Sequence, residues 1–386
     1  MRSIGFNKPY FTGKELDYIM EAVSREKISG NGYFTQKCHR LLEQRYGIKK
    51  VLLTSSCTDA LEMCALLLNI SEGDEVIMPS YTFVSTANAF VLRGARIVFA
   101  DSMPSNPNVS VASIEQLITP RTKAIVVVHY AGISCDMDQV MSLARSKNLF
   151  VIEDAAQGIE SRYKGKPLGS IGHLATFSFH ETKNVISGEG GALLINDQTF
   201  IQRAEILWEK GTNRSAFFRG EVDKYNWIDI GSSFLPSDIT AAFLLAQLEA
   251  IDAIQKKRMF LWNAYYAGLK HLKSVGVGLP EIPQDCQHNG HIFYLVCRSG
   301  QEREDILKFL NSNGVNAIFH YLSLHKSQFY ARSHSGGDLP NCDKYHDCLI
   351  RLPLYFELSV EDSAYVIGLV SAFFENRPAG QPSADF

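Results

Sequence analysis

The sequence predicts an α/β protein with a largely parallel sheet, followed by a smaller α+β unit. In the first half, short apolar runs alternate with stretches of helical periodicity, which is typical of βαβ units. Further along, this alternation gives way to one long helical stretch and then to shorter strands and helices. The 386 residues are enough for two domains of ordinary size. We therefore expect a large unit over residues 1–245 and a small one over residues 246–386.

In the large unit, a capping-box pattern at residues 12–15 predicts a helix that runs to about residue 25. Five apolar runs follow as predicted strands, with helical stretches between them. The strands are residues 50–54, 75–78, 95–100, 124–129 and 150–153, and the helices lie near residues 59–68, 84–92 and 138–147. Two more predicted strands, at 173–180 and 191–196, are separated by a loop that contains Lys183 and a glycine-rich turn.

The second half begins with one predicted helix over residues 237–272, which leads out of the large unit. The small unit then has predicted strands at 291–297 and 317–321, a helix at 303–313, and a final helix from Val360. Residues 376–386 are rich in Pro, Gly, Ala and Ser, and we expect them to form a mobile end.

Composition excludes several classes of function. The chain has 38 Lys and Arg against 41 Asp and Glu, a net charge of −3 without a basic stripe, which argues against nucleic acid as a partner. No apolar run approaches the roughly 18 residues that span a bilayer, and the amino terminus lacks a signal peptide's apolar stretch. The eight cysteines are dispersed without a C-x-x-C pair, so neither disulfides nor a zinc site are indicated. We expect a soluble, cytoplasmic enzyme without a metal.

The clearest chemical feature is the run Leu-Phe-Val-Ile-Glu-Asp-Ala-Ala-Gln at residues 149–157, an apolar strand that ends in two carboxylates. Open α/β sheets bind ligands beyond the carboxyl ends of their strands, so Glu153 and Asp154 are candidate ligand-binding groups. An aspartate that merely caps the next helix gives the same pattern. The pattern alone leaves both interpretations of Asp154 open.

Two further segments carry groups that suit one kind of cofactor. Residues 175–184 join an alternating strand to a glycine-rich loop, with Lys183 at the junction. Residues 52–61 place small polar side chains, Cys57 and Thr58 among them, where a strand leads into a helix. The N–H groups of a helix N-terminus suit a phosphate. However, a lone loop lysine is usually solvated, and an ordinary N-cap needs the same small residues.

Together the three segments meet the needs of pyridoxal 5′-phosphate (PLP): a lysine that binds it covalently, a carboxylate that keeps its ring nitrogen protonated, and a phosphate cradle. With the runs at 79–89, 210–215 and 319–321, they make the chain resemble the DegT/DnrJ/EryC1/StrS sugar aminotransferase family. The resemblance covers nearly the whole chain. It implies the fold of type I PLP-dependent aminotransferases, with a mixed, mostly parallel seven-stranded sheet.

The resemblance also implies roles for individual residues. Lys183 would bind PLP and Asp154 would pair with its ring nitrogen, as the two catalytic residues. The other implied cofactor-binding residues are Cys57, Thr58, Phe83, Gln157, Ser178 and Ser233. The implied substrate-binding residues are His180, His320, Tyr321, Arg214 and Arg219. Phe83 would stack on the ring, although a core position is the usual fate of a phenylalanine, and the loop with the two arginines could equally be solvated.

One run departs from the family pattern. Many members have a Gly-aromatic-Asn-x-Arg run whose asparagine reaches the phosphate in the neighbouring subunit. Here residues 231–235 read Gly-Ser-Ser-Phe-Leu, so that Ser233 stands at the asparagine position and Leu235 at the arginine position. The resemblance implies a homodimer with a shared active site, in which Ser233 is the residue donated across.

This Gly-Ser-Ser pattern is similar to that of the family's TDP-4-keto-6-deoxyglucose transaminases. The resemblance therefore implies transfer of an amino group from L-glutamate to the C4 ketone of this TDP-sugar, with pyridoxamine 5′-phosphate as the intermediate form. The products would be TDP-4-amino-4,6-dideoxygalactose, for enterobacterial common antigen or a related surface polysaccharide, and 2-oxoglutarate.

Several alternatives remain. A 3-keto or another 4-keto nucleotide-sugar aminotransferase would use the same chemistry. Family relatives that act as dehydratases have histidine in place of the lysine, so Lys183 argues against that activity. A nicotinamide-dependent sugar oxidoreductase or epimerase is disfavoured because no G-x-G-x-x-G run follows the first strand. A catalytically silent regulator with the same fold is the other alternative.

Overall fold

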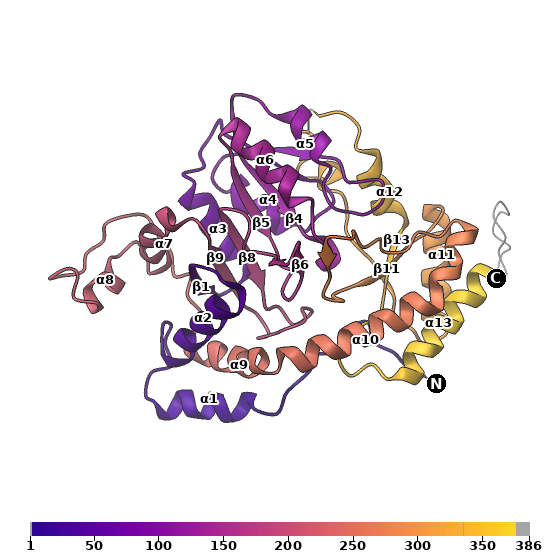
Figure 1. The fold of residues 1–386 in the computed structure, drawn as a ribbon, viewed down its shortest axis with the longest axis horizontal. Helices are drawn as coiled ribbons and strands as arrows, with labels where there is room; N and C mark the ends of the chain where they lie inside the picture. Colours follow the sequence, from indigo (N-terminus) through magenta and orange to yellow (C-terminus); the bar gives the residue numbers. More distant parts are fainter. Residues whose placement is uncertain (1, 335, 376–386) are drawn as a thin grey trace.

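The computed structural model describes residues 2–334 and 336–375, and the mobile end expected at 376–386 lies outside them. Within these residues, a seven-stranded sheet of order β1-β9-β8-β5-β4-β2-β3 forms the centre of the large unit (Figure 1). Its strands are β1 (Lys50–Thr54), β2 (Glu75–Pro79), β3 (Arg96–Ala100), β4 (Thr122–Val128), β5 (Phe150–Asp154), β8 (Leu174–Ser178) and β9 (Gly191–Ile195). Only β9 runs antiparallel, to β1 and β8, and the other pairs are parallel. The predicted mixed, mostly parallel sheet is confirmed.

Helices pack on both faces of this sheet, because successive side chains of a strand point to opposite sides. The helices of the large unit are α1 (Glu15–Ser24), α2 (Tyr33–Tyr46), α3 (Cys57–Leu67), α4 (Val84–Val91), α5 (Val111–Leu117), α6 (Met137–Lys147), α7 (Ile201–Trp208), α8 (Arg214–Phe218) and α9 (Asp238–Glu249). Leu52 of β1 shares a core with α3 and α4, whereas Val51 and Leu53 share one with α2 and α9. A third core joins β4 and β5 to α5 and α6.

The small unit is built on a three-stranded antiparallel sheet of order β11-β13-β12. Its elements are α10 (Ile251–Leu269), β11 (Phe293–Val296), α11 (Gly300–Ser312), β12 (Ile318–Phe319), α12 (Pro340–Cys348), β13 (Leu349–Leu352) and α13 (Val360–Glu375). A separate small sheet is formed by β6 (Arg162–Tyr163), β7 (Lys166–Pro167) and β10 (Cys286–Gln287). Short 3-10 helices lie at Tyr130–Gly132, Gln198–Phe200, Lys270–Val275 and Leu324–Lys326. The sequence pattern did not predict β6, β7, β10 or β13, and β13 is the central strand of the β11-β13-β12 sheet.

The single helix predicted over residues 237–272 is wrong, because the structure divides it at Ala250 into α9 and α10. Helix α9 packs against α1 and α2 of the large unit, whereas α10 packs against α13 of the small unit (Figure 1). The two helices therefore pack against different units, α9 against the large one and α10 against the small one. The division of the chain at residues 245 and 246 stays a prediction.

The predicted capping box at the start of α1 forms only in part. The Thr12 N–H donates to Glu15 Oε1 at 2.8 Å, as such a box requires. The Thr12 hydroxyl, however, accepts from the N–H of Lys14 at 3.3 Å, and α1 begins at Glu15 with Lys14 as its N-cap. Helix α1 is thus present, but with a different N-terminal arrangement.

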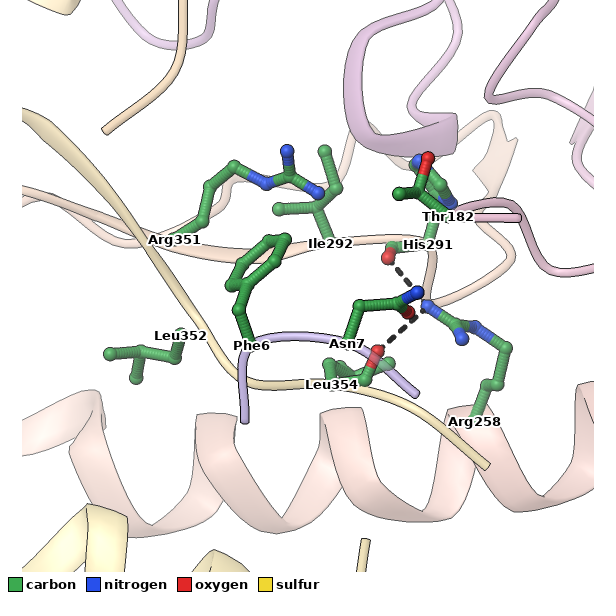
Figure 2. Close-up of a pocket in the computed structure, with 9 residues that line it drawn as sticks. All are labelled: Phe6, Asn7, Thr182, Arg258, His291, Ile292, Arg351, Leu352 and Leu354. Atoms are coloured by element: carbon green, nitrogen blue, oxygen red, sulfur yellow. Dashed lines mark hydrogen bonds between the residues drawn. The ribbon is translucent and has the colours of Figure 1, made fainter. Parts of the chain in front are cut away.

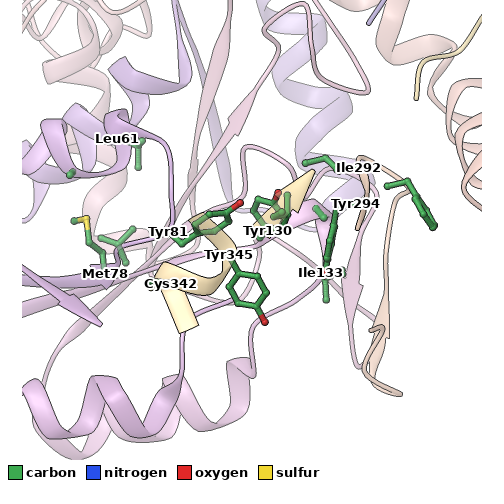
Figure 3. Packing of buried hydrophobic residues seen from close by; sticks show 14 of the residues in the cluster. Leu61, Met78, Tyr81, Tyr130, Ile133, Ile292, Tyr294, Cys342 and Tyr345 are labelled. Carbon is green, nitrogen blue, oxygen red and sulfur yellow. The ribbon is translucent and has the colours of Figure 1, made fainter. Parts of the chain in front are cut away.

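Tyrosines hold the small unit against the carboxyl-terminal edge of the large sheet (Figure 3). Tyr81 follows β2 and Tyr130 follows β4, and their ring centroids are 5.6 Å apart. Tyr294 of β11 lies 5.7 Å from Tyr130, and Tyr345 of α12 lies 5.8 Å from Tyr81. Buried aromatic pairs at these separations contribute beyond the area they bury. This cluster places the small unit over the edge where ligands are expected.

No helix in residues 2–334 and 336–375 is both long and apolar enough to cross a bilayer.

Candidate active site

A cavity of about 520 Å³ lies where β5 and β8 end and α3 begins, and the small unit contributes its other wall. Most of the residues predicted for the site line it. They are Cys57, Thr58, Phe83, Asp154, Gln157, Ser178, His180, Lys183, His320 and Tyr321. The lining also includes Glu189, Thr86, His291 and Arg351. Ser233, Arg214 and Arg219 are not part of this cavity in a single chain.

Asp154 is buried at the end of β5, with both carboxylate oxygens accepting hydrogen bonds. Oδ2 accepts from the Thr86 hydroxyl at 2.7 Å, and Oδ1 accepts from the N–H of Ala156 at 3.2 Å. The Thr86 hydroxyl lies 3.0 Å from that of Thr82. Since the single proton of Thr86 goes to Asp154, Thr82 must be the donor in that pair. No helix directly follows β5, so the interpretation of Asp154 as a helix cap is wrong.

Glu153, the other carboxylate of this run, serves a different purpose. It points to the opposite face of the sheet, as the neighbouring residue in a strand must. Its oxygens accept from His129 Nε2 at 2.9 Å and from the N–H groups of Gly169, Ile171 and Gly172 at 2.9, 2.7 and 2.6 Å. Although burial opposes the charged form, these donors keep the pKa of Glu153 below its usual value. Glu153 therefore fixes the loop before β8 instead of meeting a ligand.

Lys183 lies in the cavity wall and not on the outer surface, which rules out a solvated loop lysine. Its N–H donates to the carbonyl of His180 at 2.9 Å, which closes the turn that directs the side chain inward. Burial lowers the pKa of the Lys183 amine, while the negative charge of Asp154 acts in the opposite direction. A lowered pKa increases the fraction of neutral amine, the form that acts as a base or nucleophile.

The start of α3 offers an anion site at one end of the cavity. Ser56 is the N-cap, and its hydroxyl accepts from the N–H of Asp59 at 3.1 Å. The N–H groups of Cys57 and Thr58 belong to the first helical turn, where backbone donors have no partner within the helix. The Cys57 thiol donates to Thr176 at 3.4 Å, and burial raises its pKa to about 12. The thiol thus stays neutral beside a bound anion.

Aromatic and polar side chains line the middle of the cavity. Phe83 is 54% exposed, so the alternative that it belongs to the core is wrong. Its ring centroid lies 6.1 Å from that of Tyr321, whose hydroxyl accepts from Gln157 Nε2 at 3.0 Å. Gln157 Oε1 in turn accepts from the N–H of Ala131 at 2.6 Å. His320 Nδ1 lies 3.0 Å from the Tyr130 hydroxyl, and burial lowers the pKa of His320 well below its usual value.

Several residues that line the cavity were not predicted from the sequence, among them Thr86, His291 and Arg351. His291 lies beside Asn184, with Nδ1 2.8 Å from the amide oxygen. Arg351 extends from β13 toward His291 and Thr182 (Figure 2). One signal was available in the sequence, since a single arginine interrupts the apolar run Leu-Ile-Arg-Leu at residues 349–352.

The segment that carries Ser233, Arg214 and Arg219 lies apart from the cavity of its own chain. Helix α8 is at the far left of Figure 1, away from the central sheet. Arg219 forms ion pairs with Glu205 and Glu221 at 2.9 and 2.7 Å, and the Arg214 guanidinium lies 5.1 Å from the Phe218 ring centroid. Ser233 forms a β-bridge with Glu209. The roles of these residues stay predictions.

The groups around this cavity fit PLP. A buried carboxylate, a lysine with a lowered pKa and a helix N-terminus face one space, which has the volume of a typical small-molecule site. The acidic side chain suits a protonated ring nitrogen, and the helix N-terminus suits a phosphate.

Comparison with known proteins agrees with this chemistry. The model of the DegT/DnrJ/EryC1/StrS aminotransferase family matches residues 9–371. GDP-perosamine synthase of Escherichia coli O157:H7 is 32% identical over 98% of this chain and 100% of its own length.

Solved structures of the family have the same fold. The aminotransferase TlmJ of Streptoalloteichus hindustanus superimposes with a TM-score of 0.90, at 28% identity over 97% of this chain and 100% of its own. Spr1654 of Streptococcus pneumoniae, described as a sugar aminotransferase and solved in its PLP form, gives a TM-score of 0.88, at 25% identity over 97% and 99% of the two chains. The chain therefore belongs to the DegT/DnrJ/EryC1/StrS aminotransferase family and is a PLP-dependent sugar aminotransferase.

Proposed function

We propose that the chain transfers the amino group of L-glutamate to the C4 ketone of TDP-4-keto-6-deoxy-D-glucose. The products are TDP-4-amino-4,6-dideoxy-D-galactose and 2-oxoglutarate, made in the cytoplasm for enterobacterial common antigen or a related surface polysaccharide. One observation carries the reaction type: Lys183, Asp154 and the start of α3 face a single cavity. The choice of sugar rests on the resemblance of the 231–235 run to the TDP-sugar transaminases.

Each residue then has a defined task. PLP, when bound, supplies the electron sink that amino transfer requires. Asp154 pairs with the ring nitrogen and holds its proton, and Thr86 and the Ala156 N–H fix the carboxylate for this purpose. Lys183 Nζ, whose lowered pKa increases the fraction of the neutral form, removes the α-proton of the amino donor and later returns a proton to the sugar at C4.

The other cavity residues bind and orient. The N–H groups of Cys57 and Thr58, with the Ser178 hydroxyl, hold the phosphate of the cofactor. Phe83 covers one face of the ring, and Gln157 lies at the edge that carries the 3-hydroxyl. His180, His320 and Tyr321 face the sugar.

We further propose a homodimer in which the segment around Ser233, Arg214 and Arg219 completes the partner's site. This segment exposes large apolar side chains, with Trp227 81% and Phe218 69% exposed. Such exposure is expected of a surface that a second subunit covers. Ser233 would then donate to the phosphate in the partner, and the two arginines would meet the diphosphate of the substrate. Sedimentation of the holoenzyme tests the dimer, and a monomer with full activity would contradict it.

Product identification tests the reaction itself. The holoenzyme is incubated with L-glutamate and one keto sugar in each of three parallel reactions. The three sugars are the C4-keto TDP-sugar, the C3-keto TDP-sugar and a GDP-linked 4-keto sugar. NMR of the product is expected to show an amine at C4 of the TDP-sugar. If only the C3-keto sugar or only the GDP-sugar is aminated, the proposed substrate is wrong and the aminated sugar takes its place. An absorbance spectrum of bound PLP that does not respond to L-glutamate would indicate a silent binder.

A further inference from the structure

Arg351 occupies an unusual place in the cavity wall. It is the third residue of β13, and its side chain extends toward His291 and Thr182 (Figure 2). Arg351, His291 and Thr182 line both the main cavity and a second, much smaller pocket beside Phe6 and Asn7. Its Nε is buried and has no hydrogen-bond partner among the described residues. A buried, unpaired guanidinium donor is costly unless a ligand satisfies it.

The amino-terminal segment contacts this guanidinium through the ring of Phe6. Arg351 Cζ lies 4.6 Å from the centroid of the Phe6 ring, a distance typical of a cation–π contact. Two backbone hydrogen bonds hold the segment to the small unit, from Ile4 N–H to the Gly314 carbonyl at 2.8 Å and from Asn316 N–H to the Ile4 carbonyl at 3.0 Å. Asn7 Nδ2 donates to the carbonyl of Glu181 at 3.2 Å, next to the turn that carries Lys183. The segment therefore ties Arg351 to the lysine loop.

No residue described so far is placed to bind the α-carboxylate of an amino acid substrate. Two carboxylates, Asp154 and Glu189, line it, whereas an amino acid substrate brings a further carboxylate next to its reacting carbon. Burial lowers the pKa of His291 and of His320 well below the usual value, so both rings are neutral near pH 7. Lys183 is engaged in the chemistry. Among the described lining residues, Arg351 is the permanently charged cation that remains.

We propose that Arg351 binds the α-carboxylate of the amino donor, with Phe6 as the platform that holds the guanidinium in place. This proposal rests on the proposed function, because it names the donor subsite of that same cavity. A guanidinium suits this task, since it meets a carboxylate with two parallel N–H donors. Burial lowers the pKa of Arg351, which reflects hydration that the side chain has lost and that a carboxylate would replace.

The KM for L-glutamate and the KM for the keto sugar, measured separately, test this proposal. Arg351→Gln should raise the KM for L-glutamate roughly 10- to 100-fold, the loss expected for hydrogen bonds between charged groups, while the KM for the keto sugar stays within about twofold. Arg351→Lys keeps the positive charge but not the two parallel N–H donors of the guanidinium, so the KM for L-glutamate should rise by an intermediate amount. If Arg351→Gln raises only the KM for the keto sugar, or neither KM, the assignment is overturned.

A binding measurement makes the test independent of turnover. 2-Methyl-L-glutamate has no α-proton to lose, so its Kd, followed by the absorbance of bound PLP, reports binding alone. The Kd should rise in Arg351→Gln as the KM does. Wild-type protein that binds this compound but fails to aminate any keto sugar would contradict the proposed function and leave the donor subsite intact. Equal Kd values in wild type and Arg351→Gln would contradict the donor subsite and leave the function intact.

A substitution of Phe6 gives a second test, which leaves the charge of Arg351 in place and is expected to have a smaller effect. Phe6→Leu keeps an apolar contact but removes the ring, and it should raise the Kd for 2-methyl-L-glutamate roughly threefold. Phe329→Leu is the matched control, because Phe329 is 73% exposed and lies outside the cavity. Circular dichroism verifies the fold of each variant. If Arg351→Gln does not fold, Arg351→Lys and Phe6→Leu decide, and Kd values equal to wild type in both overturn the proposal.

Discussion

Thr86 Oγ1 donates to Asp154 Oδ2 at 2.7 Å, and both side chains are buried beside the cavity. The two residues are 68 positions apart in the chain, on α4 and at the end of β5. Thr86 thereby fixes the plane of the carboxylate that is proposed to hold the proton on the PLP ring. This contact matters because, among the described residues, the carboxylate of Asp154 has one other donor, the Ala156 N–H.

Replacing Thr86 with valine should weaken PLP binding about tenfold, because a hydrogen bond to a charged group in a buried site is worth on the order of 1.5 to 3 kcal/mol. Dialysis against PLP, followed by absorbance, measures the Kd. Thr82→Val is the control, since Thr82 donates to Thr86 and does not contact Asp154. An effect of Thr82→Val as large as that of Thr86→Val would mean that Thr86 acts only through local packing.

Gly191 allows β9 to approach the start of α3. A Cβ at this position would lie 2.4 Å from the Cys57 nitrogen and 2.5 Å from the Ser56 carbonyl carbon, which are backbone atoms that cannot move aside. Gly191→Ala should therefore displace the N-terminus of α3 and raise the Kd for PLP by at least about tenfold. Gly368→Ala is the control, because a Cβ there meets no atom within 4 Å. A Gly191→Ala variant with normal PLP affinity would show that the start of α3 does not hold the phosphate.

Glu153 should make stability depend on pH in the acid range. Its pKa is lower in the folded protein than the usual value of 4.5, so its contribution is complete above about pH 4.5 and is lost as the pH falls through the folded value. At pH 7, Glu153→Gln should reduce the free energy of unfolding by about 3 kcal/mol, because the amide cannot accept from all of the donors that surround the carboxylate.

Urea unfolding from pH 7 down to pH 3.5 measures this difference. The gap between wild type and Glu153→Gln should narrow as the pH falls below about 4.5. Glu115→Gln, on the exposed side of α5, should leave the whole profile unchanged. A gap that stays constant with pH would mean that Glu153 is not charged in the folded protein.

Local patterns in the sequence predicted the parts of the fold that depend on local order. The apolar runs that became β1, β2, β4 and β5 were recognisable because strands of a parallel sheet are buried on both faces. Helix α2 was not, since Thr35, Cys38 and His39 fill buried helical positions that apolar residues normally occupy. Strand β13 was missed because its short run pairs with two distant strands, β11 and β12, and not with a neighbour in the chain.

The same distinction applies to the site. Lys183 and Asp154 were candidates because each follows a recognisable strand, but the local pattern alone left a solvated lysine and a helix cap open. The combination of three segments and the resemblance to the family favoured their roles toward PLP. Thr86 and Arg351 were not candidates, because their roles arise only when segments far apart in the sequence meet at the cavity. Thr86 has no local pattern that distinguishes it from an ordinary helical threonine. The one signal for Arg351, its place in the apolar run at residues 349–352, does not show what the side chain meets.

Lys183→Ala asks whether Lys183 is the residue that binds PLP and moves the protons. The variant is purified with PLP, and its absorbance spectrum and its turnover of L-glutamate and the keto sugar are compared with wild type. We expect loss of the visible band of the lysine-bound cofactor and a rate at or near zero, because no other lysine lines the cavity in the described residues. A variant that keeps the visible band, or that turns over at the wild-type rate, would contradict the assignment of Lys183 and the mechanism built on it.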